Sequence, residues 1–537
     1  MASIAVPEIA PRPAVKWQGP GVLAAGRPAE RSGELRRKLP FTAAVVKLRW
    51  WLLPVAITAS IITALTTRSA SLGWSIMLAW AILPAVSADG PFHSLSLVGP
   101  TTFAAAVLFL KFGVGLPVAE SAGMEVSSTA SFRCGCFAFT LIATLLGLLR
   151  LLGPTTRNSV VTAEQLRCSE RDLGLVGLMV FAYAIMLDVV LVITGGLDRS
   201  ISTEKAYGYG EMGWWSWFAL FQDVNNIGVF LIPLAVRRWL PPAKLAIYTL
   251  IFARAGFYLL SGTRSGAMFP LFFLALGYIS FAVRLPKRFE FYAGILVALM
   301  YPVIDFTDYL RNSDFFHETK VTDIGARLSA AGKALTSLQT EDERRRSEST
   351  LVTGKALLEF SDPLIYERTP NPMPYAGFGD LHNLAYVLVP RYFMPTKPIL
   401  LDGNEIVVAY SGIRQIGTAA TVSLNADLYR RNGIPAVIVG GCVSALLVIM
   451  YLNLSVITTR RIDPAFGLLM LSMLIIMGFR HPLYHWTVLS LGSYYVYSFP
   501  KYLIFLALLL ASSRLLLARS ANAPRRMTAS GAQINIG

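Results

Sequence analysis

The sequence predicts an all-α polytopic membrane protein with about twelve transmembrane helices and one large extracytoplasmic loop before the last three. Hydrophobic residues make up 54% of the chain and charged residues only 15%, far from the composition of a soluble protein. A helix needs about 20 apolar residues to cross the hydrocarbon core of a bilayer. Segments of that kind have their centres near Ile57, Leu78, Ala106, Ile142, Ile185, Ile227, Phe252, Phe273, Val297, Val437, Met473 and Leu506.

Residues 1–40 precede the first of these segments and form a basic, proline-rich stretch. No apolar run in it has the form of a signal peptide. We expect a disordered tail on the cytoplasmic side.

Basic residues also mark the short linkers that follow every second span, for example Arg237, Arg238 and Lys244, or Arg460 and Arg461. The opposite linkers are near neutral or acidic. Because cytoplasmic linkers carry the excess of Lys and Arg, both termini are predicted in the cytoplasm of a bacterial cell, with the protein in its inner membrane. The net charge of +16 is spread over these linkers, so no basic domain for nucleic acid is predicted.

Five segments result from this topology. They are the tail 1–40, spans one to nine in 41–310, a periplasmic loop in 311–432, spans ten to twelve in 433–519, and a cytoplasmic tail 520–537. Within the loop, residues 322–360 have a helix-compatible composition, and their charged run 341–346 indicates a solvated helix face. Residues 361–429 are dense in Pro, Gly and Tyr, which suits a folded loop on the membrane surface.

The four cysteines lie in or beside spans or on the cytoplasmic side, and none has the spacing of a metal site. We therefore expect no disulfide framework, no metal and no cofactor.

Three ionisable residues fall inside predicted spans: Asp188, Asp223 and Arg254. A charge in the bilayer interior costs several kcal/mol unless it pairs or lines a wet cavity. The three fall at compatible depths, so they could meet. Two interpretations stay open, a buried pair that fixes helix packing and a polar lining for a substrate cavity.

Basic residues gather at the predicted outer face. Arginine can hold phosphate in a bidentate way, although a single interfacial arginine is also a common membrane anchor. The prolines around residues 390–398 restrict the backbone there. The set that could hold a diphosphate is Arg264, Arg391, Lys397, Arg414, Arg430 and Arg480.

Three short strings carry a resemblance to a known family: the turn SGTRSG at 261–266, VPRYFMPTKP at 389–398, and ADLYRRNGIPAVIVGG at 426–441. They resemble the O-antigen and exopolysaccharide repeat-unit polymerases, the Wzy-like group, over residues 248–447. The resemblance implies a glycosyltransferase that joins glycan units carried on undecaprenyl diphosphate, without a nucleotide sugar or an essential metal. It also implies membrane lipids, a flippase and a chain-length regulator as partners.

The chemistry of such a reaction asks for cations and a base. A diphosphate leaving group needs positive charge as the glycosidic bond breaks, and the outer basic set could supply it. For the base that activates the acceptor hydroxyl, the candidates are His382, Glu405 and Asp427, with Asp380 beside them. His382 is preferred because the turn before it could expose it, and Glu405 comes second. A surface histidine with no catalytic role is the alternative.

Two other functions fit the same pattern. An O-antigen ligase or another lipid-linked glycosyltransferase would share the architecture and the basic loop. A transporter would suit twelve spans and three intramembrane charges, but the two halves show no internal repeat and a transporter has no evident use for the long outer loop.

Overall fold

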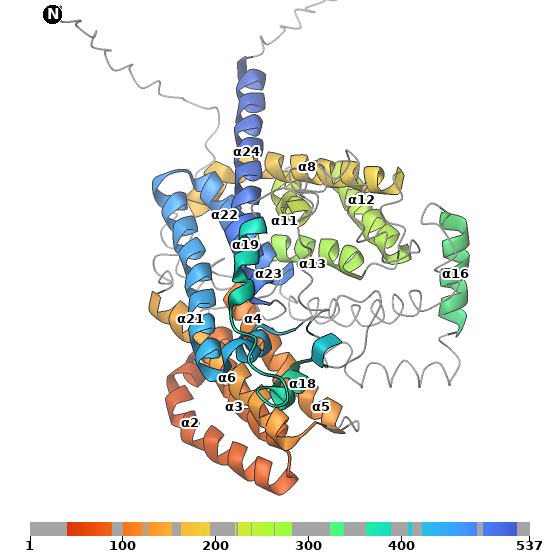
Figure 1. Cartoon of the computed structure of the whole chain (residues 1–537). Coiled ribbons are helices and arrows are strands. Elements are labelled where there is room, and N and C mark those ends of the chain that lie inside the picture. Colours follow the sequence, from red (N-terminus) through yellow and green to blue (C-terminus); the bar gives the residue numbers. More distant parts are fainter. Residues whose placement is uncertain are drawn as a thin grey trace, which may run out of the picture.

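The computed structural model describes residues 40–87, 100–121, 126–152, 163–193, 221, 224–237, 239–261, 264–281, 323–337, 361–387, 406, 408–410, 422–480 and 487–522. Every regular element in these ranges is a helix (Figure 1). The all-α prediction is confirmed for this part of the chain.

The first half of the chain forms helices from its apolar runs. In order these are α2 (Pro40–Thr67), α3 (Ala70–Ser87), α4 (Pro100–Leu108), the π-helix η1 (Phe109–Gly115), α5 (Leu116–Ser121), α6 (Ser128–Leu152), α8 (Ala163–Ile193), α11 (Asn225–Val236), α12 (Pro241–Leu260) and α13 (Arg264–Phe281). α12 begins with proline in its first turn. N–H groups there have no acceptor within the helix, so the missing N–H of proline costs no helical hydrogen bond.

In the second half, short loop helices come first and long apolar helices follow. The loop region contains α16 (Ile324–Ser337), α18 (Ser361–Arg368), the 3-10 helix η4 (Gly379–His382) and α19 (Asn383–Val387). The long helices are α21 (Leu424–Arg461), α22 (Pro464–Arg480) and the continuous run of α23 (Val488–Gly492), the π-helix η6 (Ser493–Ser498) and α24 (Phe499–Asn522). Ser423 and Thr487 cap α21 and α23 with their hydroxyls.

Helices stand at eleven of the twelve predicted centres, and the twelfth, Val297, lies outside the described residues. Six described helices are long and apolar enough to cross a membrane: α2, α6, α8, α12, α21 and the run from α23 to α24. The others are shorter. α11, for instance, has 12 residues and would cover only about 18 Å. The structure therefore confirms six spans of full length among the described residues, and the count of twelve stays a prediction.

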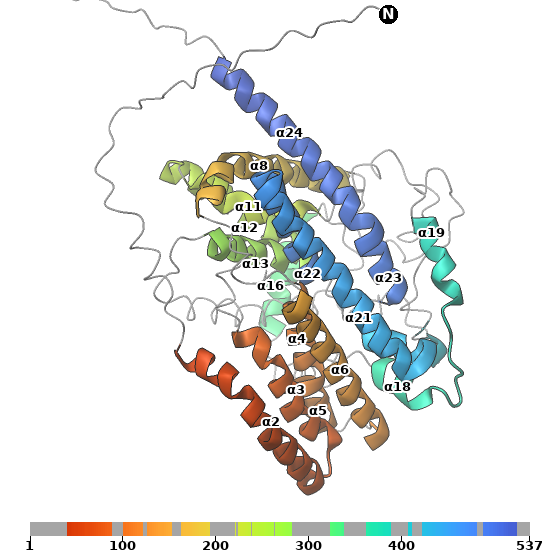
Figure 2. The same cartoon turned by 90° about the vertical axis from the view of Figure 1, so that its left-hand side faces the viewer.

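The long helices do not all share one direction. α21 and α24 have nearly parallel axes in both views, with α22 packed against both (Figures 1 and 2). α8 instead runs across α24 and packs mainly on α11, which in turn packs on α13. At the centre lies α22, whose residues are buried without interruption from Leu468 to Gly478.

One glycine sets the distance between α11 and α13. A Cβ atom at Gly277 would lie 2.0 Å from the carbonyl oxygen of Phe230. Because that oxygen belongs to the backbone, no side-chain rotation could make room for it. The close crossing of these two helices therefore depends on the absence of a side chain at position 277.

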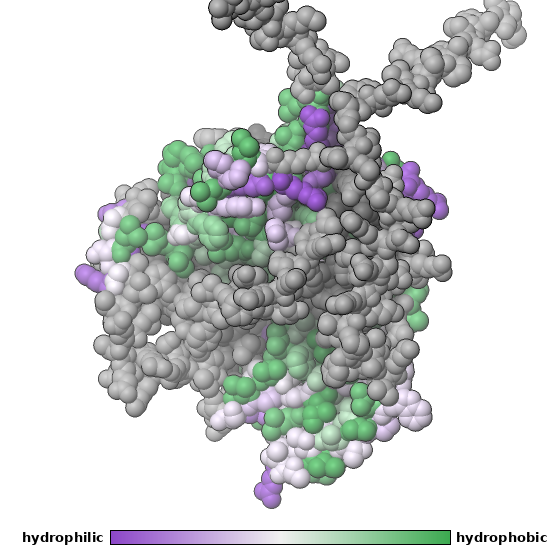
Figure 3. All heavy atoms as spheres, turned by 180° about the vertical axis from the view of Figure 1, so that it is seen from behind, coloured by the Kyte–Doolittle hydropathy of each residue, from purple (hydrophilic) through white to green (hydrophobic). Residues whose placement is uncertain are grey.

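Hydrophobic side chains cover much of the described surface, in both its upper and lower parts (Figure 3). On α2, Trp51 is 79% and Leu65 74% exposed, and Ala56 is the one buried residue in the described range 50–67 of that helix. Apolar faces of this extent mark a contact with lipid or protein rather than water. Together with the six long apolar helices, this is the pattern of an integral membrane protein.

Candidate functional site

The start of α21 is a bent helix end. Its first turns, from Leu424, lie within the segment that the sequence assigns to the loop, and helical geometry breaks at Asn432 (φ −159°, ψ 35°) and Gly433 (φ 63°, ψ −149°). The positive φ favours glycine, and Pro435, which cannot donate to the helix ladder, follows at once. The break separates two helical turns from the membrane-length part of α21.

A compact set of charges forms there, here called the outer ion cluster after the extracytoplasmic loop predicted for residues 311–432. It consists of Asp427, Arg430 and Arg431 on those two turns and Asp380 in η4. Arg431 Nε lies 3.1 Å from Asp427 Oδ2, and Arg430 Nε lies 2.7 Å from Asp427 Oδ1. The guanidinium of Arg431 also binds Asp380 with two nitrogens, its Nη2 at 2.8 Å from Oδ2 and its Nη1 on Oδ1. Asp427 and Arg431 are fully buried, whereas 37% of the Asp380 side chain is exposed.

The cluster joins three parts of the chain. The backbone N–H of Val488, in α23, donates to Asp427 Oδ2 at 2.8 Å. The N–H groups of Ala376 and Gly377 donate to the carbonyls of Arg430 and Arg431 at 2.9 Å each. Residues 374–387, here called the cover segment, are thereby fixed over the bent end of α21.

The electrostatics of Asp380 follow from this pairing. Partial burial alone would raise the pKa of the Asp380 carboxyl, but the hydrogen bonds and the charge of Arg431 outweigh burial and hold that pKa below its usual range. Asp380 therefore stays an anion at neutral pH.

His382 lies at the end of η4 in the cover segment and is exposed. Its Nδ1 is 2.6 Å from the carbonyl oxygen of Gly379. Since a carbonyl only accepts hydrogen bonds, Nδ1 carries the proton in the neutral ring and Nε2 keeps its lone pair. This geometry leaves a nitrogen that can accept a proton from outside.

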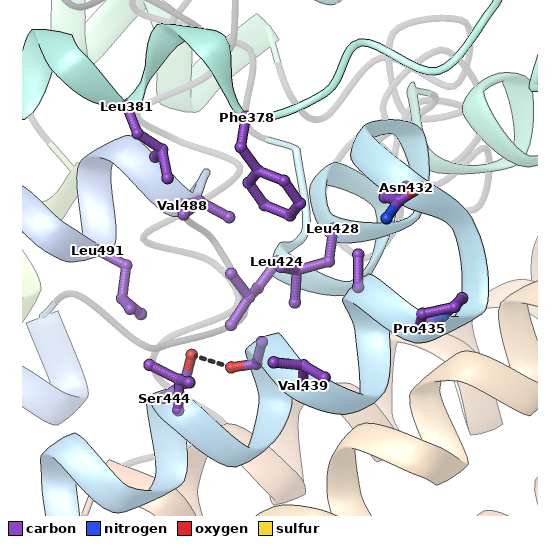
Figure 4. A pocket seen from close by; sticks show the side chains of 13 residues that line it. Phe378, Leu381, Leu424, Leu428, Asn432, Pro435, Val439, Ser444, Val488 and Leu491 are labelled. Carbon is purple, nitrogen blue, oxygen red and sulfur yellow. Dashed lines mark hydrogen bonds between the residues drawn. The ribbon is translucent and has the colours of Figure 1, made fainter.

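An apolar groove of about 380 Å³ lies between the cover segment, α21 and α23 (Figure 4). Its volume falls within the ~300–1,000 Å³ of ligand sites. It borders the outer ion cluster, since the Phe378 ring in its wall is 5.7 Å from Arg431 Cζ. Its lining residues include Phe378, Leu381, Leu424, Leu428, Val439, Val443, Val488 and Leu491.

A second polar network, between η1, α18 and α21, supports the same end of α21. Lys111 Nζ, on η1, lies 3.4 Å from Asp362 Oδ2, on α18, and both side chains are buried. Asp362 Oδ1 accepts from the backbone N–H of Ser423 at 3.0 Å, and Asn425 Nδ2 donates to the Tyr366 hydroxyl at 2.8 Å. The first turn of α21 is thus held by Asp362 on one side and by the outer ion cluster on the other.

Two of the three intramembrane charges meet. Arg254, on α12, binds both carboxylate oxygens of Asp188, on α8, with Nη2 at 3.2 Å from Oδ1 and Nε on Oδ2. Tyr258 donates its hydroxyl to the same carboxylate, and all three side chains are largely buried. Asp223 lies outside the described residues.

We expect Arg254→Ala to lower the stability of the folded protein by about 3–5 kcal/mol, because it leaves the buried Asp188 carboxylate without its counter-ion. The double variant with Asp188→Ala should recover part of the loss. Thermal unfolding in detergent, followed by fluorescence-detected size exclusion, measures both. Normal stability of the single variant, with all activity lost and a lost dependence on an ion gradient, would instead favour the transporter.

The remaining predicted residues are distributed as follows. Arg430 and Asp427 belong to the outer ion cluster, and His382 lies in the cover segment. Arg264 begins α13 and Arg480 ends α22, but their side chains are outside the described part of the structure. Also outside the described residues are Arg391, Lys397, Glu405 and Arg414.

Three residues of the site were not singled out from the sequence: Lys111, Asp362 and Arg431. A lysine inside the apolar run 108–115 is the same signal that marked Asp188, so Lys111 could have been found. Arg431 adjoins Arg430 in the string at 426–441. Nothing in the sequence sets Asp362 apart from other loop carboxylates.

No family model, no curated protein and no solved structure significantly matches this chain. The class of protein that the fold defines is a helical integral membrane protein with an ion cluster and an apolar groove at one end of α21, the longest helix in the described part of the chain.

Proposed function

We propose that the protein is a glycosyltransferase that polymerises oligosaccharide repeat units carried on undecaprenyl diphosphate, at the periplasmic face of the inner membrane. One observation carries the proposal: an apolar groove and a cluster of two arginines share the bent end of α21. A polyprenyl diphosphate has the matching chemistry, an apolar chain joined to a compact anion. The resemblance of the strings at 261–266, 389–398 and 426–441 to the polymerases supports the same function.

The groove is suited to a chain that arrives from the lipid. Val439 and Val443 lie one helical turn apart on α21. They are 61% and 59% exposed, and both line the groove. In a membrane this side of α21 would contact acyl chains. A polyprenyl chain could then enter sideways and leave its diphosphate at the polar end of α21.

The reaction needs one proton transfer and one leaving group. A hydroxyl oxygen of one repeat unit attacks the anomeric carbon of another, the bond from that carbon to the diphosphate oxygen breaks, and undecaprenyl diphosphate leaves. We propose that Nε2 of His382 accepts the proton of the attacking hydroxyl. His382 is exposed, and the carbonyl of Gly379 fixes its tautomer. Asp427 is less suited as a base, because three N–H donors already occupy its oxygens.

Purified protein in detergent, supplied with undecaprenyl-diphosphate-linked repeat units, tests the proposal. We expect a ladder of longer glycans and released undecaprenyl diphosphate, with no nucleotide sugar and no ion gradient present. Persistence of single units would contradict polymerisation. Transfer only to an added lipid A core would identify a ligase.

A strain that lacks the protein provides a second test of the proposal. Loss of a polymerase should leave single lipid-linked repeats on the periplasmic leaflet. Loss of a transporter would leave them on the cytoplasmic leaflet, which would contradict the proposal.

A further inference from the structure

We propose that Arg431 is an anion-binding site that Asp380 keeps closed, and that a lipid-linked diphosphate opens it by displacing the Asp380 carboxylate. The assignment of the ligand as a lipid diphosphate rests on the proposed function. The displacement rests on the geometry of the outer ion cluster.

The two carboxylates on Arg431 are held very differently. Asp427 is fully buried, lies in the same helix, and accepts from Arg430, Arg431 and the Val488 backbone. Asp380 belongs to the cover segment, is 37% exposed, and has Arg431 as its ion-pair partner. Removing Asp380 from its place therefore exposes one carboxylate to water, whereas removing Asp427 would break the end of α21.

The charge balance of the cluster favours an anion as the replacement for the Asp380 carboxylate. Two arginines and two aspartates give the closed cluster a net charge of zero, that is +2 − 2. Without Asp380 the sum is +2 − 1, so one positive charge remains on two guanidiniums. Asp380 already binds Arg431 through two nitrogens, which is the arrangement in which a guanidinium also holds a phosphate group.

Asp380 is also connected to the apolar groove. Phe378 and Leu381, which flank it in the cover segment, form part of the groove wall and face Leu424, Leu428 and Val488 (Figure 4). A shift of the η4 backbone that takes Asp380 away from Arg431 would carry these two side chains with it. One motion would thus free the anion site and widen the groove, as a ligand with an anion and an apolar chain requires.

The test is the affinity of the purified full-length protein for farnesyl diphosphate, measured in detergent at low ionic strength by microscale thermophoresis. Asp380→Asn keeps the size of the side chain and removes its charge. We expect about 5- to 10-fold tighter binding, because the ion pair that closes the site, with one partly exposed member, lowers the fraction of the protein that is competent to bind. Unchanged or weaker binding overturns the proposal.

Two matched variants complete the test. Asp380→Glu retains the charge and should bind like the wild type. Asp463→Asn removes a carboxylate that pairs in the same bidentate way with Arg514, at 2.7 and 3.0 Å, and should leave the affinity unchanged. An equal gain in Asp463→Asn would show a general effect of net charge and would overturn the assignment to Arg431.

Inorganic pyrophosphate separates the two sources of the anion. A gain for pyrophosphate alone, with none for farnesyl diphosphate, would overturn the assignment to a lipid. Because binding is measured without turnover, failure of this inference would leave polymerisation intact. Failure to polymerise, with tighter binding in Asp380→Asn, would remove the proposed reaction and keep the anion site.

Discussion

Replacing Lys111 by Met should leave little folded protein in the membrane. Met has about the same length as Lys but no charge, so the buried Asp362 carboxylate loses its counter-ion. That carboxylate accepts the N–H of Ser423 at the start of α21. Breaking a buried ion pair from one side costs about 3–5 kcal/mol. Thermal unfolding by fluorescence-detected size exclusion should show a lower transition temperature and a smaller monodisperse peak.

The double variant Lys111→Met, Asp362→Asn is the decisive control. It removes both charges and keeps an acceptor for the Ser423 N–H, so we expect most of the lost stability to return. Lys244→Met, which changes a lysine bonded to the exposed turn at Arg237, should behave like the wild type. A single Lys111 variant as stable as the wild type would show that the pair contributes little to the fold.

Replacing His382 by Ala should lower the rate of polymerisation by about 10²- to 10⁴-fold, the usual contribution of a general base. The stability of the protein should stay near normal, because His382 is exposed and its ring bonds to a neighbouring carbonyl in the same turn. The rate is measured with purified protein and lipid-linked repeat units, from the appearance of glycans longer than one repeat.

Tyr386→Phe provides the matched control for His382, since the two rings neighbour each other at 6.5 Å in the cover segment. We expect polymerisation at the wild-type rate in this variant. Wild-type rates in the His382 variant itself would remove histidine as the base and make Glu405 the next residue to replace.

The sequence alone determined the helical class and the positions of most helices. Long runs of Leu, Ala, Val and Phe can satisfy their backbone groups in an apolar setting only as helices, and helices occupy eleven of the twelve predicted centres. The predicted boundary between the loop 311–432 and the segment 433–519 falls where α21 is bent. These properties are local, so nearby residues are enough to decide them.

Tertiary structure decided which charges meet. Asp188 and Arg254 were both predicted from the cost of a lone charge in a span, but their pairing depends on how α8 and α12 cross. Asp380 and Arg431 are 51 residues apart, and no local rule selects that carboxylate over its neighbours. Arg430 and Arg431 adjoin in sequence, yet the 100° step of a helix directs Arg431 toward both aspartates and leaves Arg430 with one.

Packing also separates apolar helices that hydropathy alone cannot tell apart. Hydropathy reports how apolar a segment is, but an apolar helix gains the same transfer free energy against protein as against lipid. The apolar residues of α11 and α22 are buried among other helices, whereas most of those on α2 are exposed at the surface. Only the contacts between helices distinguish these cases, and for the same reason the direction of α8 across α24 could not be deduced from its composition.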